Sequence, residues 1–104
     1  MAKQHRQSNT LTRDRLTPPA MYDVVFHNDD FTTMDFVVRV LRQVFFISAE
    51  EAVDIMLKVH NSESAVVGTY PFDIASSKAR TAMSMARAEE FPLKVTIEEH
   101  SLPF

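Results

Sequence analysis

The sequence contains no cysteine and only a single glycine. Without thiols the chain has no disulfides, no thiolate nucleophile and no cysteine-ligated zinc site, and it fits a reducing compartment. With one glycine it has no Walker loop or other glycine-rich segment to hold a phosphate, and it has no GxSxG motif. These absences argue against a hydrolase.

Long apolar runs are also missing. No stretch approaches the roughly 20 apolar residues that a membrane helix requires. Residues 1–20 contain no apolar segment of the kind found in a secretory signal, so we expect a cytoplasmic protein. Apolar residues make up 45% of the 104 residues, which fits one domain with an adequate core.

Charge is distributed unevenly along the chain. Residues 1–20 hold four Lys and Arg against one Asp and so carry +3, whereas the whole chain carries −3, which leaves −6 for residues 21–104. An acidic body argues against a nucleic-acid-binding domain, which normally has a basic face. Residues 1–17 are polar and aperiodic, and we predict a disordered N-terminal arm there, followed by a core domain over 18–104.

Hydrophobic patterning predicts six elements in the order β-α-α-β-α-β. Residues alternate in apolar character in three segments, which indicates strands, and repeat at helical spacing in three others. The expected fold is an α/β (α+β) two-layer sandwich, in which a small, three-stranded, mainly antiparallel sheet is covered by three helices. The expected strands are 21–27, 64–70 and 93–98, and the expected helices are 33–46, 48–60 and about 73–90.

Local signals mark several boundaries of these elements. Thr32 or Thr33 can cap the first helix, and the sequence from Ser48 to Glu51 matches a capping box for the second. Asp73 can cap the third helix. The lone Gly68 lies inside a predicted strand, where glycine often marks a bulge or a close backbone approach.

A polar triplet, Asn28-Asp29-Asp30, separates the first predicted strand from the first helix. One interpretation is a polar turn with an Asp near a helix N-terminus. The other is a site for a cation or an amine, because two carboxylates and an amide can accept several charge-assisted hydrogen bonds. Of the two acids, Asp30 lies nearer the helix, and we expect it to serve in capping.

His60 ends the second predicted helix and gains relevance only if that helix brings it beside the triplet. His27, Asp29, Asp30 and His60 could then hold a metal ion, and a metal-dependent enzyme is one alternative function. Their spacing matches no standard zinc pattern, and neither HxxxH nor HExxH is present. We therefore expect no metal and no cofactor.

Taken together, several segments resemble the ClpS adaptor family in order and spacing. The resemblance covers about residues 18–99, and HNDDFTTM followed by MLKVH is its most specific part. The segments are PPAMYDVVFHNDDFTTMDFVVRVL, AVDIMLKVH, AVVGTYPFDIASSKA and FPLKVTIEE.

The resemblance implies an adaptor, not an enzyme. The family delivers substrates to the ClpAP protease and recognises proteins whose N-terminal residue is Leu, Phe, Tyr or Trp. Asn28, Asp29 and His60 match the positions that bind the substrate's α-amine. Met34 matches a residue at the pocket mouth that disfavours β-branched side chains. The positions that match the hydrophobic pocket are Phe26, Thr32, Met34, Val37, Met56, Val59 and Leu93.

The resemblance also implies a second surface, through which the family docks onto the N-terminal domain of a Clp AAA+ ATPase of the ClpA or ClpC type. Asp73 and Lys78 match positions there, and the arm over residues 1–17 matches the segment that is fed toward the unfoldase. The expected protein is a monomer with no nucleic-acid or membrane partner. Its fold is similar to the C-terminal domain of the ribosomal stalk protein, so a stalk-like interaction domain is the other alternative.

Three residues depart from the family's usual pattern. Glu63 stands where many members carry glycine, and Ser76 and Ser77 stand where Glu-Thr is more common. The first changes a loop near His60 and its charge, and the other two leave the docking contacts open.

Overall fold

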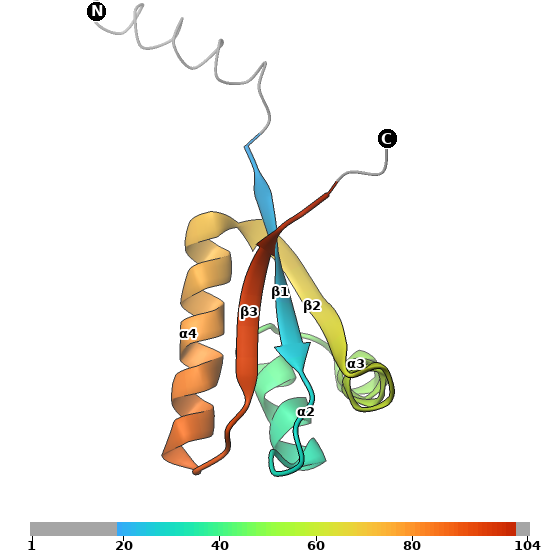
Figure 1. Cartoon of the computed structure of the whole chain (residues 1–104). Coiled ribbons are helices and arrows are strands. Elements are labelled where there is room, and N and C mark those ends of the chain that lie inside the picture. Colours follow the sequence, from blue (N-terminus) through green and yellow to red (C-terminus); the bar gives the residue numbers. More distant parts are fainter. Residues whose placement is uncertain (1–18, 102–104) are drawn as a thin grey trace, which may run out of the picture.

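The computed structural model describes residues 19–101. The predicted disordered arm, residues 1–17, therefore lies outside the described residues. The observed order of elements is β-α-α-β-α-β, as predicted, in an α+β arrangement (Figure 1). The elements are β1 (Met21–His27), α2 (Met34–Gln43), α3 (Ala49–Ser62), β2 (Ser64–Pro71), α4 (Phe72–Ala88) and β3 (Lys94–Glu99).

The three strands form an antiparallel sheet in the order β2-β1-β3. The central strand β1 alternates as its sequence predicts, with Phe26 opposite Ala65 of β2 and Val95 of β3. These three residues are buried and belong to the hydrophobic core. The centre of the sheet thus holds the end of β1, from which the polar triplet continues.

The helices complete the core. In α4 every buried residue is an alanine, and these small side chains let the helix approach the sheet closely. Figure 1 shows α4 running alongside β3, with α3 viewed end-on beside the far end of β2. The buried alanines are Ala75, Ala79, Ala82 and Ala86.

The start of helix α2 agrees with the prediction from the sequence, whereas its end differs. Thr33 is the N-cap, and its hydroxyl oxygen accepts a hydrogen bond from the backbone N–H of Phe36. The helix ends at Gln43, three residues before the predicted end at 46. The reason is tertiary: Lys78 Nζ donates to the carbonyl oxygen of Val44 at 2.6 Å, and Phe46 adopts a left-handed backbone with φ of 55°.

The cap predicted for α4 is wrong. Asp73 lies in the first turn, and the N-cap is Pro71, which makes no side-chain hydrogen bond to the helix. The helix follows β2 without a loop, so its start is set by the strand and by proline's fixed φ. Asp73 still suits the positive end of the helix dipole.

Gly68 lies at a shift of the strand register and at a close approach of another side chain, as expected for a glycine inside a strand. The register between β1 and β2 shifts there, since Val24 pairs with Gly68 whereas Val25 pairs with Val66. A Cβ atom on Gly68 would lie 2.7 Å from Cε2 of Tyr70, so the ring occupies the space that any side chain would need. The glycine therefore allows both the bulge and the packing of Tyr70.

Candidate functional site

A cavity of about 370 Å³ opens where β1 ends, between the following loop, the start of α2, and α3. It brings the polar triplet beside His60, as the sequence analysis required for a shared site. Polar groups and apolar side chains both face it. Its lining residues are Asn28, Asp29, Asp30, Phe31, Thr32, Thr33, Met34, Val37, Met56, Val59 and His60.

The carboxylate of Asp29 organises the loop. Its Oδ1 accepts from the backbone N–H groups of Phe31 at 2.8 Å and Thr32 at 2.7 Å, and its Oδ2 accepts from the Thr32 hydroxyl at 2.7 Å. Burial would raise the pKa of the Asp29 carboxyl, but the hydrogen bonds from Thr32 and Phe31 outweigh it and hold the pKa below its ordinary value. Asp29 is therefore ionised at neutral pH, and Oδ2 keeps a lone pair for a ligand.

Asp30 does not have the capping role expected of it. Its side chain is exposed, and within residues 19–101 its carboxylate accepts no hydrogen bond. The capping geometry belongs to Asp29, whose side chain reaches the N–H groups two and three residues ahead. Asp30 instead places a second negative charge at the edge of the cavity.

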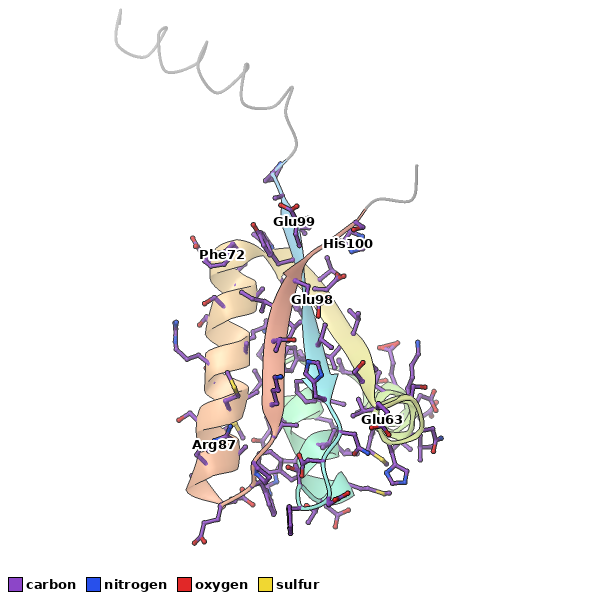
Figure 2. The ribbon with its side chains drawn as sticks, viewed as in Figure 1. Glu63, Phe72, Arg87, Glu98, Glu99 and His100 are labelled. Carbon is purple, nitrogen blue, oxygen red and sulfur yellow. The ribbon has the colours of Figure 1, made fainter. Side chains whose placement is uncertain are left out.

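Asn28 is held by its backbone. Its N–H donates to the carbonyl oxygen of Glu63 at 2.8 Å, which ties the loop to the C-terminal end of α3. Glu63 caps that helix with a left-handed φ of 73°, and Figure 2 shows it where α3 meets β2. Among the described residues, neither the Asn28 amide nor the exposed His60 ring has a hydrogen-bond partner, so both can serve a ligand.

Apolar side chains from two helices form the rest of the cavity. Val37 and Val59 are almost completely buried, at 7% and 4% exposure, and give the wall a fixed shape. Met34 is 45% exposed and Met56 half-buried, so the two flexible thioethers line the accessible part. The cavity thus combines a carboxylate, an amide and an imidazole with an apolar wall.

Comparisons with known proteins agree with this geometry. Residues 17–96 match the family described as ATP-dependent Clp protease adaptor protein ClpS. The chain belongs to the ClpS family. It is 46% identical to the ClpS adapter of Nitrosomonas eutropha over 87 residues, 84% of each chain, and 51% identical to that of Desulfatibacillum aliphaticivorans over 80 residues, 77% of each chain.

A solved ClpS structure shares the fold. Agrobacterium tumefaciens ClpS2, determined bound to L-phenylalaninamide, superimposes with a TM-score of 0.78 at 37% identity and covers 80% of this chain and 100% of its own. The predicted fold class is therefore confirmed, and so is the function as an adaptor of the Clp protease. No helix among residues 19–101 is long and apolar enough to cross a membrane.

Two pocket positions carried over from the ClpS resemblance do not line the cavity. Phe26 is 0% exposed and Leu93 is 1% exposed, and both are buried in the core. Phe26 lies on β1 and Leu93 directly precedes β3, and both belong to the core between the sheet and the helices. Conversely, Phe31 and Thr33 line the cavity but were not among the expected residues. Their adjacency to the polar triplet is the sequence signal that could have found them.

The four residues of the metal alternative are not all brought together in this ClpS fold: Asp29, Asp30 and His60 line the cavity, whereas His27 does not. His27 lies on β1 and its Nε2 pairs with Thr96 Oγ1 of β3 at 2.8 Å, across the sheet. Within the described part of the chain, no three His, Asp or Glu side chains are grouped so as to hold a metal ion. The geometry therefore does not support a metal-dependent enzyme.

The two expected docking residues of the ClpS resemblance differ in environment. Asp73 is exposed in the first turn of α4. Lys78 is half-buried: beyond its bond to the Val44 carbonyl, its Nζ lies 4.8 Å from the ring centroid of Phe46, 5.4 Å from Tyr70 and 5.6 Å from Phe45. Lys78 therefore already has internal partners, which fix the loop between α2 and α3.

Proposed function

We propose that this ClpS family member binds the free α-amine and the bulky hydrophobic side chain of a protein's N-terminal Leu, Phe, Tyr or Trp, and delivers that protein to a Clp ATPase–protease. The observation that carries the proposal is one cavity that joins Asn28, Asp29 and His60 to an apolar wall. The ligand of the related ClpS2, L-phenylalaninamide, has the same two parts, a free amine and an apolar side chain.

The polar side of the cavity suits an ammonium group. A free α-amine has a pKa of about 8, so at neutral pH it is mostly a cation with three N–H donors. Oδ2 of Asp29, the carbonyl of the Asn28 amide and an unprotonated nitrogen of His60 supply acceptors. Hydrogen bonds to a charged group contribute roughly 1.5–3 kcal/mol each. An internal peptide segment has no such group and would leave these acceptors unpaired.

The apolar side of the cavity selects the side chain. Burying a Leu or Phe side chain gains roughly 1.5–3 kcal/mol. Val37 and Val59 form a rigid base, whereas Met34 and Met56 adjust to ligands of different shape. Met34 at the mouth disfavours branching at Cβ, so N-terminal Ile and Val are expected to bind poorly.

Delivery requires a second surface on the same chain. The proposed partner is the N-terminal domain of a ClpA-type or ClpC-type ATPase, and Asp73 is the exposed acid proposed to contact it. Lys78 contributes by positioning the neighbouring loop. Residues 1–17, polar and basic in sequence, are proposed to act as the arm that engages the unfoldase.

Fluorescence anisotropy of labelled peptides tests the binding step. Peptides that begin with free Leu or Phe are expected to bind, whereas free Ile and N-acetylated Phe are expected to bind at least tenfold more weakly. His60→Ala removes an exposed acceptor without a packing role, so it is expected to weaken binding of free Phe while leaving the melting temperature unchanged. Equal binding of free and acetylated Phe would contradict the amine site.

A further inference from the structure

A second hollow, of about 640 Å³, runs along the outer face of α2. It lies apart from the peptide cavity, since the two have no lining residue in common. Asp35 stands in the first turn of the helix, and the apolar lining gathers toward the other end and the loop that follows. The residues that matter there are Val38, Arg39, Arg42, Phe46 and Ile47.

Phe46 is the most exposed large apolar side chain of the described residues, at 81%. Its φ of 55° is a left-handed conformation that disfavours an aromatic residue. Exposure and backbone strain both make Phe46 a poor choice for stability, and glycine or asparagine would suit the position better. Left-handed residues also follow α3 at Glu63 and α4 at Glu90, so this conformation is the way these helices end, and the unusual feature of Phe46 is an exposed aromatic ring at such a position.

The ring of Phe46 is nevertheless held in place. Lys78 Nζ lies 4.8 Å from its centroid and anchors the loop through the carbonyl of Val44. The neighbouring Phe45 is buried at 6% exposure and fixes the backbone from the other side. The protein therefore presents Phe46 on a rigid base, which lowers the entropy cost of binding a partner.

The charges beside Phe46 are positive. Arg39 is neutralised by a bidentate ion pair with Glu89. Arg42, in the last turn of α2, has no ion pair among the described residues, and Lys78 adds a second cation next to the ring. This end of the hollow therefore complements an acidic segment, although residues 21–104 carry −6 as a whole. The chain's own residues 1–20 carry +3 and have the wrong sign to occupy it.

The hollow is continuous with the proposed docking surface. Ile74 and Lys78 are four residues apart and share one face of α4, and Ile74 is 46% exposed. Phe72 is 51% exposed and begins the same helix, where Figure 2 labels it. Lys78 therefore connects the two regions, because it shares a helix face with Ile74 and contacts the ring of Phe46.

We infer that Phe46 and the hollow beside it bind an acidic, apolar segment of the Clp ATPase, with Phe46 as the apolar anchor and Arg42 as the charged contact. This inference rests on the proposed function, because it extends the docking surface for the same partner. It differs from the contact that the ClpS resemblance implies, because it assigns binding to α2 and the loop that follows, and it gives Lys78 a positioning role.

Two variants of the full-length chain test the inference. Phe46→Asn removes the ring and suits a left-handed backbone, and Glu90→Asn is its matched control, because Glu90 has a φ of 63° and is exposed elsewhere. Arg42→Glu reverses the charge, and Lys94→Glu on β3 is its control. Calorimetric titration with isolated N-terminal domains of a ClpA-type and a ClpC-type ATPase is expected to show at least tenfold weaker binding for both test variants and less than twofold change for both controls.

Three results would overturn the inference. The first is that Phe46→Asn and Arg42→Glu both bind the ATPase domains within twofold of wild type. The second is that the wild-type chain binds neither domain. The third is that the wild-type chain sediments as a dimer that Phe46→Asn dissociates, which would mean that a second copy of the chain covers Phe46. Anisotropy with the free-Phe peptide is measured on the same samples. If that peptide binds while the test variants change nothing, only the inference about the hollow fails. If the peptide does not bind, the proposed function fails by itself.

Discussion

Two loops of this protein invite comparison, the loop from Asn28 to Thr33 after β1 and the loop from Val44 to Ser48 after α2. Each is organised by one charged side chain for which the ClpS resemblance implies contact with a binding partner. Asp29 accepts three hydrogen bonds inside the first loop. Lys78 donates to the Val44 carbonyl and faces three rings in and beside the second. In both, the charged side chain shapes the surface that is proposed to meet a partner.

The two surfaces then differ in shape. The first loop borders a cavity in which polar acceptors face buried valines, which suits the end of a peptide chain. The second loop projects Phe46 from the surface beside an open hollow, which suits a protein partner that brings its own pocket. If both proposals hold, one fold separates recognition of a small group from docking of a large one.

The largest effect is expected for Asp29→Ala. It removes the carboxylate proposed to bind the ligand's amine, together with the loop's three internal hydrogen bonds. Binding of a free-Phe peptide is therefore expected to fall about 100-fold, and the free energy of unfolding to fall by about 2 kcal/mol. Anisotropy and urea denaturation measure the two losses. Asp30→Ala, which removes an exposed carboxylate, is the control and should change stability by less than about 0.5 kcal/mol.

Lys78→Met is the corresponding change at the second loop. The apolar stem is retained, but the Val44 carbonyl and the rings lose their cation, so we expect a loss of about 1–2 kcal/mol in the free energy of unfolding. Peptide binding should stay within twofold of wild type, because Lys78 does not line the cavity. Lys58→Met, on the exposed face of α3, provides the reference. A loss of peptide binding in Lys78→Met would show that the two regions are coupled.

Each region also holds a left-handed residue that is not glycine, Glu63 at the first and Phe46 at the second. Glycine at either position relieves the backbone, so Glu63→Gly and Phe46→Gly should each stabilise the protein by about 1 kcal/mol. Thermal and urea unfolding measure the gain. Glu51→Gly, inside α3, should instead destabilise by about 1 kcal/mol. If Glu63→Gly also destabilised, its side chain would have a stabilising contact that outweighs the strain.

The smallest effect concerns pH. The pKa of Asp29 is held below its ordinary value of 3.8 in the folded protein, so its contribution to stability is present above that value and is lost as the pH falls through the lower folded pKa. Urea denaturation at pH 7, 4 and 3 should therefore show a smaller acid loss in Asp29→Asn than in wild type. Identical pH profiles would mean that the carboxylate gains nothing from ionisation in the fold.

Much of the fold followed from local pattern. Strand β1 was predicted with its exact bounds, because Tyr22, Val24 and Phe26 recur at every second position in a short segment that the polar triplet ends. Ser48 was readable as a cap from its capping-box sequence, and Thr33 was one of two candidates, Thr32 being the other; in the structure Thr33 and Ser48 each accept from an N–H three residues ahead. The predicted end of α2 was wrong because Lys78 acts on Val44 from outside the local sequence. The predicted cap of α4 was wrong because the helix begins directly after Pro71 of β2, which places Asp73 inside the first turn.

The site was predictable only in part. That Asn28, Asp29 and His60 share a cavity required the resemblance, since Asp29 and His60 are 31 positions apart in the sequence. The same resemblance included Phe26 and Leu93, which the packing of the sheet buries away from the cavity. It also gave no sign that Phe46 would be exposed.

The sequence by itself determined the types and order of the elements, their apolar faces and the acidic character of the body, because these depend on periodicity and composition. Asp29, and not Asp30, organises its loop through local hydrogen bonds, to residues two and three positions ahead. Only the tertiary structure decided that Lys78 faces inward and that Phe46 faces outward. These choices depend on contacts such as the 2.6 Å bond from Lys78 to Val44, which joins residues 34 positions apart. The energy of such a contact arises only when the helices and the sheet have packed together.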